Sequence, residues 1–580
     1  MRSLRWARRA VQSLTAAVVL GVPAAAGAAT ITVDSSGDTV GNDGNCILRE
    51  AVINANNDDT SGSIDCATGA GADVIDLSTS VTLSTPGDDD AAALGDLDVT
   101  EDLTIQGIGP VAINGMSGAR IFEVPAGPVD LTLNDLELNG GSITTPETGE
   151  PAAEGGAIRF RQAGQLDLSN TIVHNASVTD PSDANRGGGI YVESGSHVTI
   201  RNGSAIDDNQ AGVGLSAFAT GSPAGGGGIY AEGAGVQITV DSGSEVSGNV
   251  AGAGAADAQG NGGGISFGGS GAGAPSLTLI DATLSGNSAG GDGTNALGGG
   301  GGLYVQPVTS PTVNITDSTV SGNHAGGGPG DSFGSGGGIA VDTGQADVNL
   351  SGATVRLNTA GGNGGDGSAW GGGIYTQSGI EIGGSTISLN AAGIPGSLNS
   401  LNVGGGIYLL RGNQTTTNPD ANIHDSTISG NFATGSGGGI KRAAQDNQAF
   451  PDDTLSRVTI ANNHTGGSLR AGQGAGLSVE SGGTTTIDSS TLSGNVTDGP
   501  AGTPSQGAGI LAESASGAPV GPSGSMQPGS LSLTNSTVSG NQAAGGEGGD
   551  GGGLATVADG THLAPAVQIV ASTLAGNEAD

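Results

Sequence analysis

The amino-acid sequence predicts an all-β protein, a right-handed parallel β-helix in which short strands stack coil upon coil. Three observations lead to this fold class. A pair of short sequence strings recurs at a regular spacing along most of the chain. Within each repeat apolar residues alternate with polar ones, as in strands that bury one face. Glycine makes up 115 of the 580 residues and aromatic residues only 2%, so the side chains are too small for the thick core of an ordinary globular enzyme.

The repeat consists of two strings. The first is Gly-Gly-Gly-Ile or a close variant, the second resembles Ser-Thr-Ile-Ser-Gly-Asn, and each occurs 12 times at an average spacing of about 37 residues. One copy contains three apolar segments, at 190–192, 197–200 and 205–209, separated by small polar turns. Three short strands cannot bury a core alone, whereas stacked copies pair each strand with its equivalent one coil away. The asparagines of the second string are Asn175, Asn209, Asn249, Asn287, Asn323, Asn358, Asn390, Asn431, Asn463, Asn495, Asn541 and Asn577.

Stacking places equivalent residues of successive coils about 4.8 Å apart. We therefore expect internal ladders of Ile, Val and Leu, and a ladder of the repeat asparagines whose amides hydrogen-bond from coil to coil. The glycines before each Ile are expected to adopt positive φ at a close bend. The segment between each asparagine and the next glycine string is rich in Gly, Ala and Asp, and we interpret it as a loop that projects from one edge.

The first 29 residues have the features of a secretory signal peptide. Four arginines fall within the first nine residues, an apolar run extends from Ala10 to Ala26, and small residues continue to Ala29. We therefore expect an exported protein, located outside the cell or at the bacterial cell surface.

Residues 30–66 differ from the repeats. Residues 31–33 are expected to form a short strand, and residues 47–55 carry apolar side chains spaced for one face of a helix. The string Cys-Ile-Leu-Arg-Glu-Ala at 46–51 resembles the CSLREA-type domain at the start of many exported bacterial β-helix proteins, with Ile47 in place of serine. The resemblance implies a small cap with a short helix. A solenoid needs such a cover, because its first coil has an open apolar end.

The two cysteines, Cys46 and Cys66, are 20 residues apart. In an exported chain such a pair predicts one disulfide. A metal site is disfavoured, because no histidine lies near them.

The repeats also resemble a known family. The strings Gly-Gly-Ala-Ile at 155–158 and Ile-Ser-Gly-Asn at 428–431 are similar to the paired motifs of chlamydial polymorphic outer membrane proteins, with Ile, Val or Leu in place of the usual Phe. This resemblance implies a β-helix over about residues 155–577 and a surface-exposed protein with a role in adhesion. The string at 105–109 resembles a segment of pectin-lyase-like β-helices and implies the fold only.

The predicted domain organisation has four parts. They are a signal peptide at 1–29, a CSLREA-type cap at 30–66, opening β-helix coils at 67–150 and repetitive coils at 151–580.

The charge of the chain restricts its partners. Acidic residues number 55 against 16 basic ones, a formal net charge of −39. Such a surface repels nucleic acid and anionic lipid, so neither is expected as a partner. No mature segment approaches the roughly 18 apolar residues of a membrane span, so an integral membrane protein is not expected. The basic residues of the repeats are scattered and interpreted as solvated surface, although Arg159, Arg161, Arg186 and Arg201 fall in neighbouring coils.

No catalytic or metal-binding residue is predicted. Few basic residues are present for a lyase mechanism, and the carboxylate pair Asp207 and Asp208 lacks the further motifs of glycan hydrolases. Asp281 and Asp317 occupy equivalent positions in adjacent coils and could together hold Ca²⁺, or they are two solvated turn residues. No other cofactor is expected.

All five tyrosines directly follow the Ile or Leu of the glycine string. They are Tyr191, Tyr230, Tyr304, Tyr375 and Tyr408. Other repeats have Arg, Lys or Ser at this position, so we expect it to face outward, with consecutive tyrosines stacked. Exposed aromatic ladders can bind sugars or a protein surface. The alternative is that β-favouring residues simply occupy the outside of a strand.

The sequence favours an exported β-helical protein without catalytic activity, adhesin-like or structural, whose partner is a surface glycan or a protein. The alternative is a carbohydrate-active β-helix enzyme, a polysaccharide lyase or a glycoside hydrolase.

Overall fold

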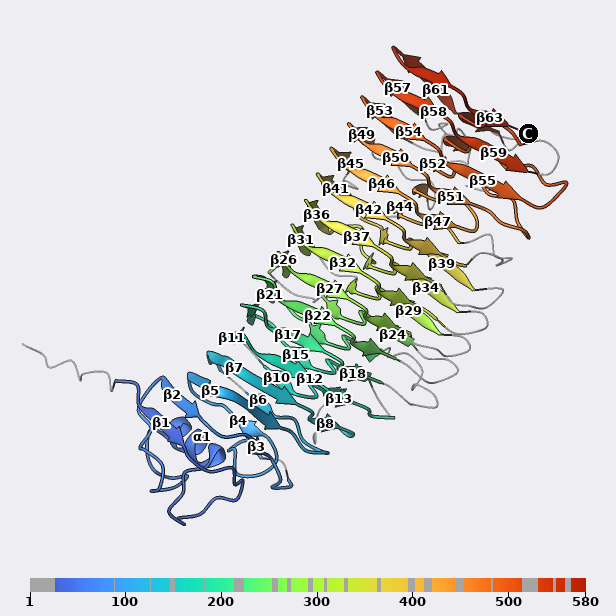
Figure 1. The fold of residues 1–580 in the computed structure, drawn as a ribbon. Helices are drawn as coiled ribbons and strands as arrows, with labels where there is room; N and C mark the ends of the chain where they lie inside the picture. Colours follow the sequence, from blue (N-terminus) through green and yellow to red (C-terminus); the bar gives the residue numbers. More distant parts are fainter. Residues whose placement is uncertain are drawn as a thin grey trace, which may run out of the picture.

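The computed structural model is a parallel β-solenoid whose coils stack along one axis, with the N-terminal segment at one end and the last coil at the other (Figure 1). The predicted fold class is confirmed, because every pairing between the strands is parallel and joins a strand to its equivalent in the next coil. The structure describes residues 27–579 apart from 88, 126, 147–151, 162, 182–183, 213–223, 253–258, 269–272, 291–295, 307–309, 328–331, 362–366, 395–401, 412–419, 445–451, 481–482, 514–529, 546–548 and 559–564. Most of the predicted signal peptide, residues 1–26, lies outside this part.

The largest sheet of the described residues contains 29 strands in two neighbouring rows, which β5 and β7 join by continuing from one row into the other. The first row consists of β1 (Thr30–Val33), β2 (Asp73–Leu77), β5 (Leu103–Asn114), β7 (Leu131–Asn139), β11 (Gln165–Ser169), β16 (His197–Arg201), β21 (Gln237–Val240), β26 (Ser276–Ile280), β31 (Thr312–Thr316), β36 (Asp347–Ser351), β41 (Ile380–Gly383), β45 (Ala421–His424), β49 (Asp453–Ser456), β53 (Thr484–Asp488), β57 (Ser530–Thr534) and β61 (Ala566–Val570). The second row adds β3 (Val81–Thr82), β12 (Ile172–His174), β17 (Ala205–Asp207), β22 (Glu245–Ser247), β27 (Thr283–Ser285), β32 (Thr319–Ser321), β37 (Thr354–Arg356), β42 (Thr386–Ser388), β46 (Thr427–Ser429), β50 (Thr459–Ala461), β54 (Thr491–Ser493), β58 (Thr537–Ser539) and β62 (Thr573–Ala575).

Three further sheets complete the described coils. The 14-stranded sheet consists of β4 (Leu97–Asp98), β6 (Phe122–Val124), β10 (Ile158–Phe160), β15 (Ile190–Val192), β20 (Ile229–Ala231), β25 (Ile265–Phe267), β30 (Leu303–Val305), β35 (Ile339–Val341), β40 (Ile374–Thr376), β44 (Ile407–Arg411), β48 (Ile440–Ala444), β52 (Leu477–Glu480), β56 (Ile510–Glu513) and β60 (Leu554–Val557). The 13-stranded sheet consists of β8 (Ser142–Ile143), β13 (Ser177–Val178), β18 (Gln210–Ala211), β23 (Val250–Ala251), β28 (Ser288–Ala289), β33 (His324–Ala325), β38 (Thr359–Ala360), β43 (Ala391–Ala392), β47 (Phe432–Ala433), β51 (His464–Thr465), β55 (Val496–Gly499), β59 (Gln542–Gly545) and β63 (Glu578–Ala579). The seven-stranded sheet consists of β9 (Ala152–Glu154), β14 (Ala184–Arg186), β19 (Ala224–Gly225), β24 (Gln259–Asn261), β29 (Leu297–Gly299), β34 (Phe333–Ser335) and β39 (Ser368–Trp370).

The core is a continuous aliphatic interior along the stacking axis. Ile190, Ile229 and Ile265 lie in direct register on β15, β20 and β25 and are fully buried. The same alternation holds on the 29-stranded sheet, where Val198 and Ile200 are buried and the residues between them are not. The predicted internal ladders of Ile, Val and Leu are therefore confirmed. Each side chain meets an equivalent one about 4.8 Å above and below it, which lets small aliphatic residues form a closely packed interior.

The predicted asparagine ladder is present, with one correction. Eleven asparagines from Asn209 to Asn577 are joined side chain to side chain between successive coils. Asn175 is not among them. Because Val173 pairs with Ile206, the equivalent of Asn209 is Ala176, and Asn175 stands one residue too early and is exposed.

The first glycine of the repeated string adopts the expected left-handed conformation. Gly226 has φ of 59°. A Cβ there would lie 2.1 Å from the carbonyl oxygen of Ile229, so only glycine fits this bend.

The N-terminal end is covered by α1 (Leu48–Asn57), whose apolar residues belong to the same core cluster as β1 and β2. Figure 1 shows α1 beside β1 at this end. The guanidinium of buried Arg49 pairs with Asp38 (2.8 Å) and donates to three backbone carbonyls of residues 92–96. Glu50 accepts a hydrogen bond from the backbone N–H of Gly41 (2.8 Å). β1 already pairs in register with β2, so residues 30–66 supply the first strand of the coil row as well as the helix.

The predicted disulfide between Cys46 and Cys66 is confirmed. It joins the residue before Ile47, the N-cap of α1, to the segment that follows the helix. In the described part of the chain no helix combines the length and the apolar character that a membrane crossing requires.

Candidate functional site

The candidate site lies on the outer face of the 14-stranded sheet. The first and third residues of each short strand point into the core, and the second points outward. On β40, for example, Ile374 and Thr376 are fully buried in the interior, whereas Tyr375 belongs to a separate cluster outside it. In order along the sheet, the outward position is occupied by Asp98, Glu123, Arg159, Tyr191, Tyr230, Ser266, Tyr304, Ala340, Tyr375, Tyr408, Lys441, Ser478, Leu511 and Ala555.

The tyrosines point away from the aliphatic interior, but the expectation that they are exposed is wrong. The five phenol rings belong to residues that are between 1% and 9% exposed. The reason is the seven-stranded sheet, whose strands come from segments interpreted as projecting loops. A Cβ added at Gly225 would lie 2.6 Å from the ring of Tyr230, and one at Gly299 would lie 2.9 Å from that of Tyr304. Glycine thus lets the seven-stranded sheet approach the rings closely.

The charged residues in the same ladder are buried as well. Arg159 lies 3.6 Å from Glu123, and Lys441 lies 3.3 Å from Glu480. The interpretation of these basic residues as solvated surface is therefore wrong. A basic side chain at an outward strand position can be buried when carboxylates surround it.

The expected stacking of consecutive tyrosines is confirmed for one of the two pairs. Tyr191 and Tyr230 are parallel, with ring centroids 5.9 Å apart. Tyr375 and Tyr408 are 5.8 Å apart and tilted, and the indole of Trp370 packs against both rings.

An aromatic cavity of about 330 Å³ opens where β24, β29, β34 and β39 meet the outer face of β30, β35 and β40. Two of the predicted tyrosines, Tyr304 and Tyr375, contribute rings to it, and Phe333 and Trp370 contribute two more from the seven-stranded sheet. Phe333 and Trp370 pack edge to face at 4.7 Å. Its complete lining is Gln259, Asn261, Leu297, Gly298, Gly299, Tyr304, Phe333, Ser335, Asp342, Trp370, Tyr375, Gln377 and Leu410.

A chain of polar groups links the two tyrosines of the aromatic cavity. The hydroxyl of Tyr304 donates to Asp342 Oδ2 (3.1 Å), and the amide of Gln377 donates to Asp342 Oδ1 and to the hydroxyl of Tyr375 (2.9 Å). Asp342 and Gln377 directly follow β35 and β40 and are half-buried. Burial, and for Tyr304 the adjacent Asp342 carboxylate, raises the pKa of both phenols above its ordinary value, so they stay protonated donors.

A charged cluster occupies the same face towards the N-terminus. Arg186 Nη1 contacts Glu154 (3.4 Å) and Glu232 (2.8 Å), and Arg159 lies 3.7 Å from Glu154. The hydroxyl of Tyr191 donates to Glu232 (2.8 Å). Burial raises the pKa of Glu154 to about 7, although both arginines lower it.

The four arginines that fall in neighbouring coils, Arg159, Arg161, Arg186 and Arg201, do not all contact the same carboxylate. Arg159 and Arg186 meet at Glu154. Arg161 lies near Glu193 (3.8 Å), and Arg201 pairs with Asp167 (2.7 Å) on the 29-stranded sheet.

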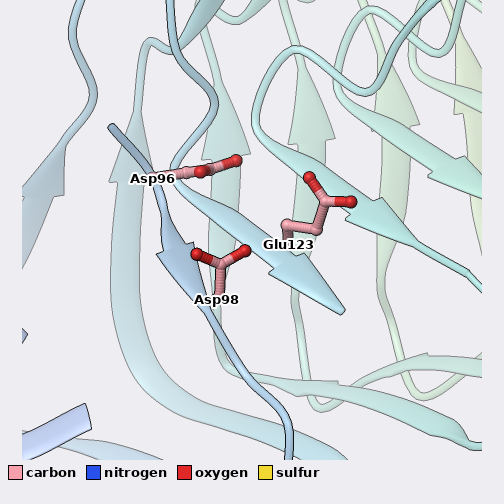
Figure 2. Close-up of side chains that lie close together, drawn as sticks. All are labelled: Asp96, Asp98 and Glu123. Atoms are coloured by element: carbon pink, nitrogen blue, oxygen red, sulfur yellow. The ribbon is translucent and has the colours of Figure 1, made fainter. Parts of the chain in front are cut away.

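Three buried carboxylates, of Asp96, Asp98 and Glu123, lie within 4.8 Å of one another. Figure 2 shows them facing a common space between β4 and β6. Burial and the neighbouring Asp96 raise the pKa of Asp98 to about 9, which keeps this carboxyl protonated. Arg120 Nη1 contacts both Asp96 (3.2 Å) and Glu123 (2.6 Å). We interpret this group as an ion-pair network, because one guanidinium contacts the carboxyl groups of both Asp96 and Glu123.

The remaining sequence candidates lie apart from this face. Asp281 and Asp317 are exposed turn residues with φ near 50°, and the calcium prediction for them stays a prediction. Asp207 is on β17 of the 29-stranded sheet, with Asp208 in the turn after it.

Four residues of the aromatic cavity were not predicted from the sequence: Phe333, Asp342, Trp370 and Gln377. Asp342 and Gln377 occupy a second outward position in their repeats. It lies two residues after the position that holds the tyrosines, and this spacing can be read from the sequence. Trp370 directly precedes a glycine string. Aromatic residues on both sides of that string were the available signal.

Comparison with known proteins gives no family assignment. No protein-family model matches the chain, and no curated protein matches it. Among solved structures, the periplasmic alginate epimerase AlgG aligns over 81% of this chain and 76% of its own, with 12% identity and a TM-score of 0.32. The A-module of the mannuronan C-5 epimerase AlgE6 from Azotobacter vinelandii aligns over 93% of this chain and 97% of its own, with 13% identity and a TM-score of 0.30.

Proposed function

We propose that the protein is exported and binds a glycan in the aromatic cavity, in an adhesin-like or structural role outside the cell. The observation that carries this proposal is the combination of four aromatic rings with Asp342 and Gln377 in one cavity of about 330 Å³. The C–H faces of a sugar ring pack on aromatic rings, and its hydroxyls bond to carboxylate and amide groups. The volume falls at the lower end of the range for small-ligand sites, about 300 to 1,000 Å³.

The scaffold suits such a role. Strand register fixes the spacing of the rings, so binding does not have to order a loop. Export rests on the features of residues 1–29.

Trp370 offers a direct test, because the only other tryptophan, Trp6, lies in the predicted signal peptide. We expect short oligosaccharides from a glycan panel to shift the fluorescence of the mature chain and to give a saturable calorimetric titration. Binding should weaken roughly three- to tenfold in Phe333→Ala, which loses one ring contact.

Phe432→Ala is the matched control. Phe432 is also half-buried and packs edge to face, against His464 at 5.6 Å, but it lies on β47, away from the aromatic cavity. The Phe432→Ala variant should bind the glycan with the same affinity as the unchanged protein. Equal losses in both variants, or no binding of any glycan, would refute the proposal.

A second candidate, a carbohydrate-active enzyme, is favoured by Glu154. A carboxyl with a pKa of about 7 is suited to proton transfer near neutral pH, and Tyr191, Arg159 and Arg186 lie close by. Incubation with the same glycan panel tests it. New reducing ends or unsaturated ends that vanish in Glu154→Gln would establish the enzyme, and their absence would leave glycan binding alone.

A further inference from the structure

We propose that the aromatic cavity selects sugars with a free amine, binding hexosamine oligosaccharides more tightly than neutral ones and uronates least. This inference rests on the proposed glycan binding and adds the charge class of the ligand.

The charge of the lining supports this selectivity. Asp342 is the one ionisable acid among the described residues that line the aromatic cavity, and no lysine, arginine or histidine lines it. An ammonium group placed there gains an opposite charge and aromatic neighbours, the two features that attract cations to aromatic sites. A uronate carboxylate gains neither.

Asp342 has room for this partner. Its Oδ1 accepts one side-chain hydrogen bond from Gln377, and its Oδ2 accepts one from Tyr304. A carboxylate accepts about four hydrogen bonds, so acceptor positions remain on a side chain that is only half-buried.

Arg186 and Lys441, two basic residues on this face whose side chains the structure describes, lie several coils from Asp342. Arg186 is aligned with Ser335, in the coil of Asp342, four coils away, about 19 Å, and Lys441 is aligned with Ala340 of that coil three coils away, about 14 Å. Both basic side chains are paired with glutamates. The formal net charge of −39 further favours the approach of a cationic sugar.

The test compares three short oligosaccharides of equal length: a β-linked glucosamine oligomer, its fully N-acetylated counterpart and an oligouronate. Affinities are measured by calorimetry and by Trp370 fluorescence at a mildly acidic pH, where the amine is protonated. The free-amine oligomer should bind about tenfold more tightly than the acetylated one, because a charge-assisted hydrogen bond replaces a neutral one. The oligouronate should bind most weakly.

Two variants with the same change in charge separate the cavity from the general acidic surface. Asp342→Asn should bring the affinity ratio of amine to acetylated oligomer close to one. Asp347→Asn removes an exposed carboxylate on β36 of the same coil and should keep the tenfold ratio.

Each other result has a distinct meaning. If the acetylated oligomer or the uronate binds as tightly as the amine, or if both variants lower the ratio alike, the inference falls and glycan binding stands. If none of the three ligands binds, the inference falls, and the wider glycan panel decides the proposed function.

Discussion

At the residue scale, an arginine and an aspartate occupy interior positions where the stacked repeats predicted aliphatic residues. Arg442 on β48 is in register with Leu409 and Val479, so its side chain enters the interior. There it pairs with Asp453 on β49, and both residues are at most 2% exposed. Removing one partner of such a pair leaves a buried charge and commonly costs about 3–5 kcal/mol.

The buried carboxyls make stability depend on pH. Burial raises the pKa of Glu154 to about 7 and that of Asp98 to about 9. In the folded protein each group keeps a proton that the unfolded chain loses above about pH 4. The stabilising contribution is therefore complete below that pH and declines by about 1.4 kcal/mol per group and pH unit as the pH rises to the folded pKa.

We therefore expect Glu154→Gln to flatten the fall of stability between about pH 4 and about pH 7. The glutamine cannot ionise, so the contribution of position 154 to this fall disappears while that of Asp98 remains. Urea midpoints measured across the interval test this, with Asp347→Asn, an exposed position, as the control that should retain the slope. A slope that is unchanged in Glu154→Gln would contradict the raised pKa.

At the element scale, the asparagine ladder connects the coils through hydrogen bonds at each turn. Asn358 donates to the carbonyl oxygen of Val320 (2.9 Å) and to Oδ1 of Asn390 (3.0 Å). Its own Oδ1 accepts from the backbone and side-chain nitrogens of Asn323 (3.0 Å each). All four residues are fully buried or nearly so, so water cannot replace a lost partner.

We expect Asn358→Ala to destabilise the adjoining coils by about 3 kcal/mol or more. The substitution leaves several buried donors and acceptors unpaired, each at a cost of about 1–3 kcal/mol. Hydrogen exchange of β33 and β38 measures the effect locally. Asn577→Ala is the matched control, since Asn577 is half-buried and, among the described residues, its side chain is bonded only to the preceding coil, and it should cost less. If both substitutions lowered stability equally, the hydrogen bonds of the interior ladder would not contribute the expected stability.

The repeat pattern predicts the stacking, the aliphatic interior and the asparagine ladder because each depends on local alternation and spacing. Asn175 shows the limit of string matching, since a one-residue shift moves it to the outside. The seven-stranded sheet was not predicted, because glycine-rich segments in a sequence usually indicate loops. In the structure, Gly225 and Gly299 instead lie on strands that pack closely against tyrosine rings. The aromatic cavity depends on that sheet, and so its residues Phe333 and Trp370 could not be placed.

At the scale of the whole molecule, a solenoid is nearly one-dimensional. Each coil contacts its neighbours only, so a local change should weaken nearby coils and fade with distance. The cap is the clearest place to test this. It holds α1, the disulfide and the buried Arg49. It meets the coils through the pairing of β1 with β2, through Arg49 near β4, and through Asp38, which accepts hydrogen bonds from the segment after β3.

Replacing both Cys46 and Cys66 by alanine should destabilise the cap by about 3 kcal/mol, the value for a closed loop of this size. The two cysteines are 20 residues apart in sequence. Without the disulfide, the unfolded chain regains the conformational freedom of the loop between them. We expect faster hydrogen exchange in α1, β1 and β2, and unchanged exchange in β31 and β36. Aliphatic ladders continue through those distant strands regardless of the cap, because their partners are supplied by the coils on either side. A uniform loss of protection from β1 to β36 would instead mean that the coils unfold as one cooperative unit, and the cap would then govern the stability of the distant aromatic cavity as well.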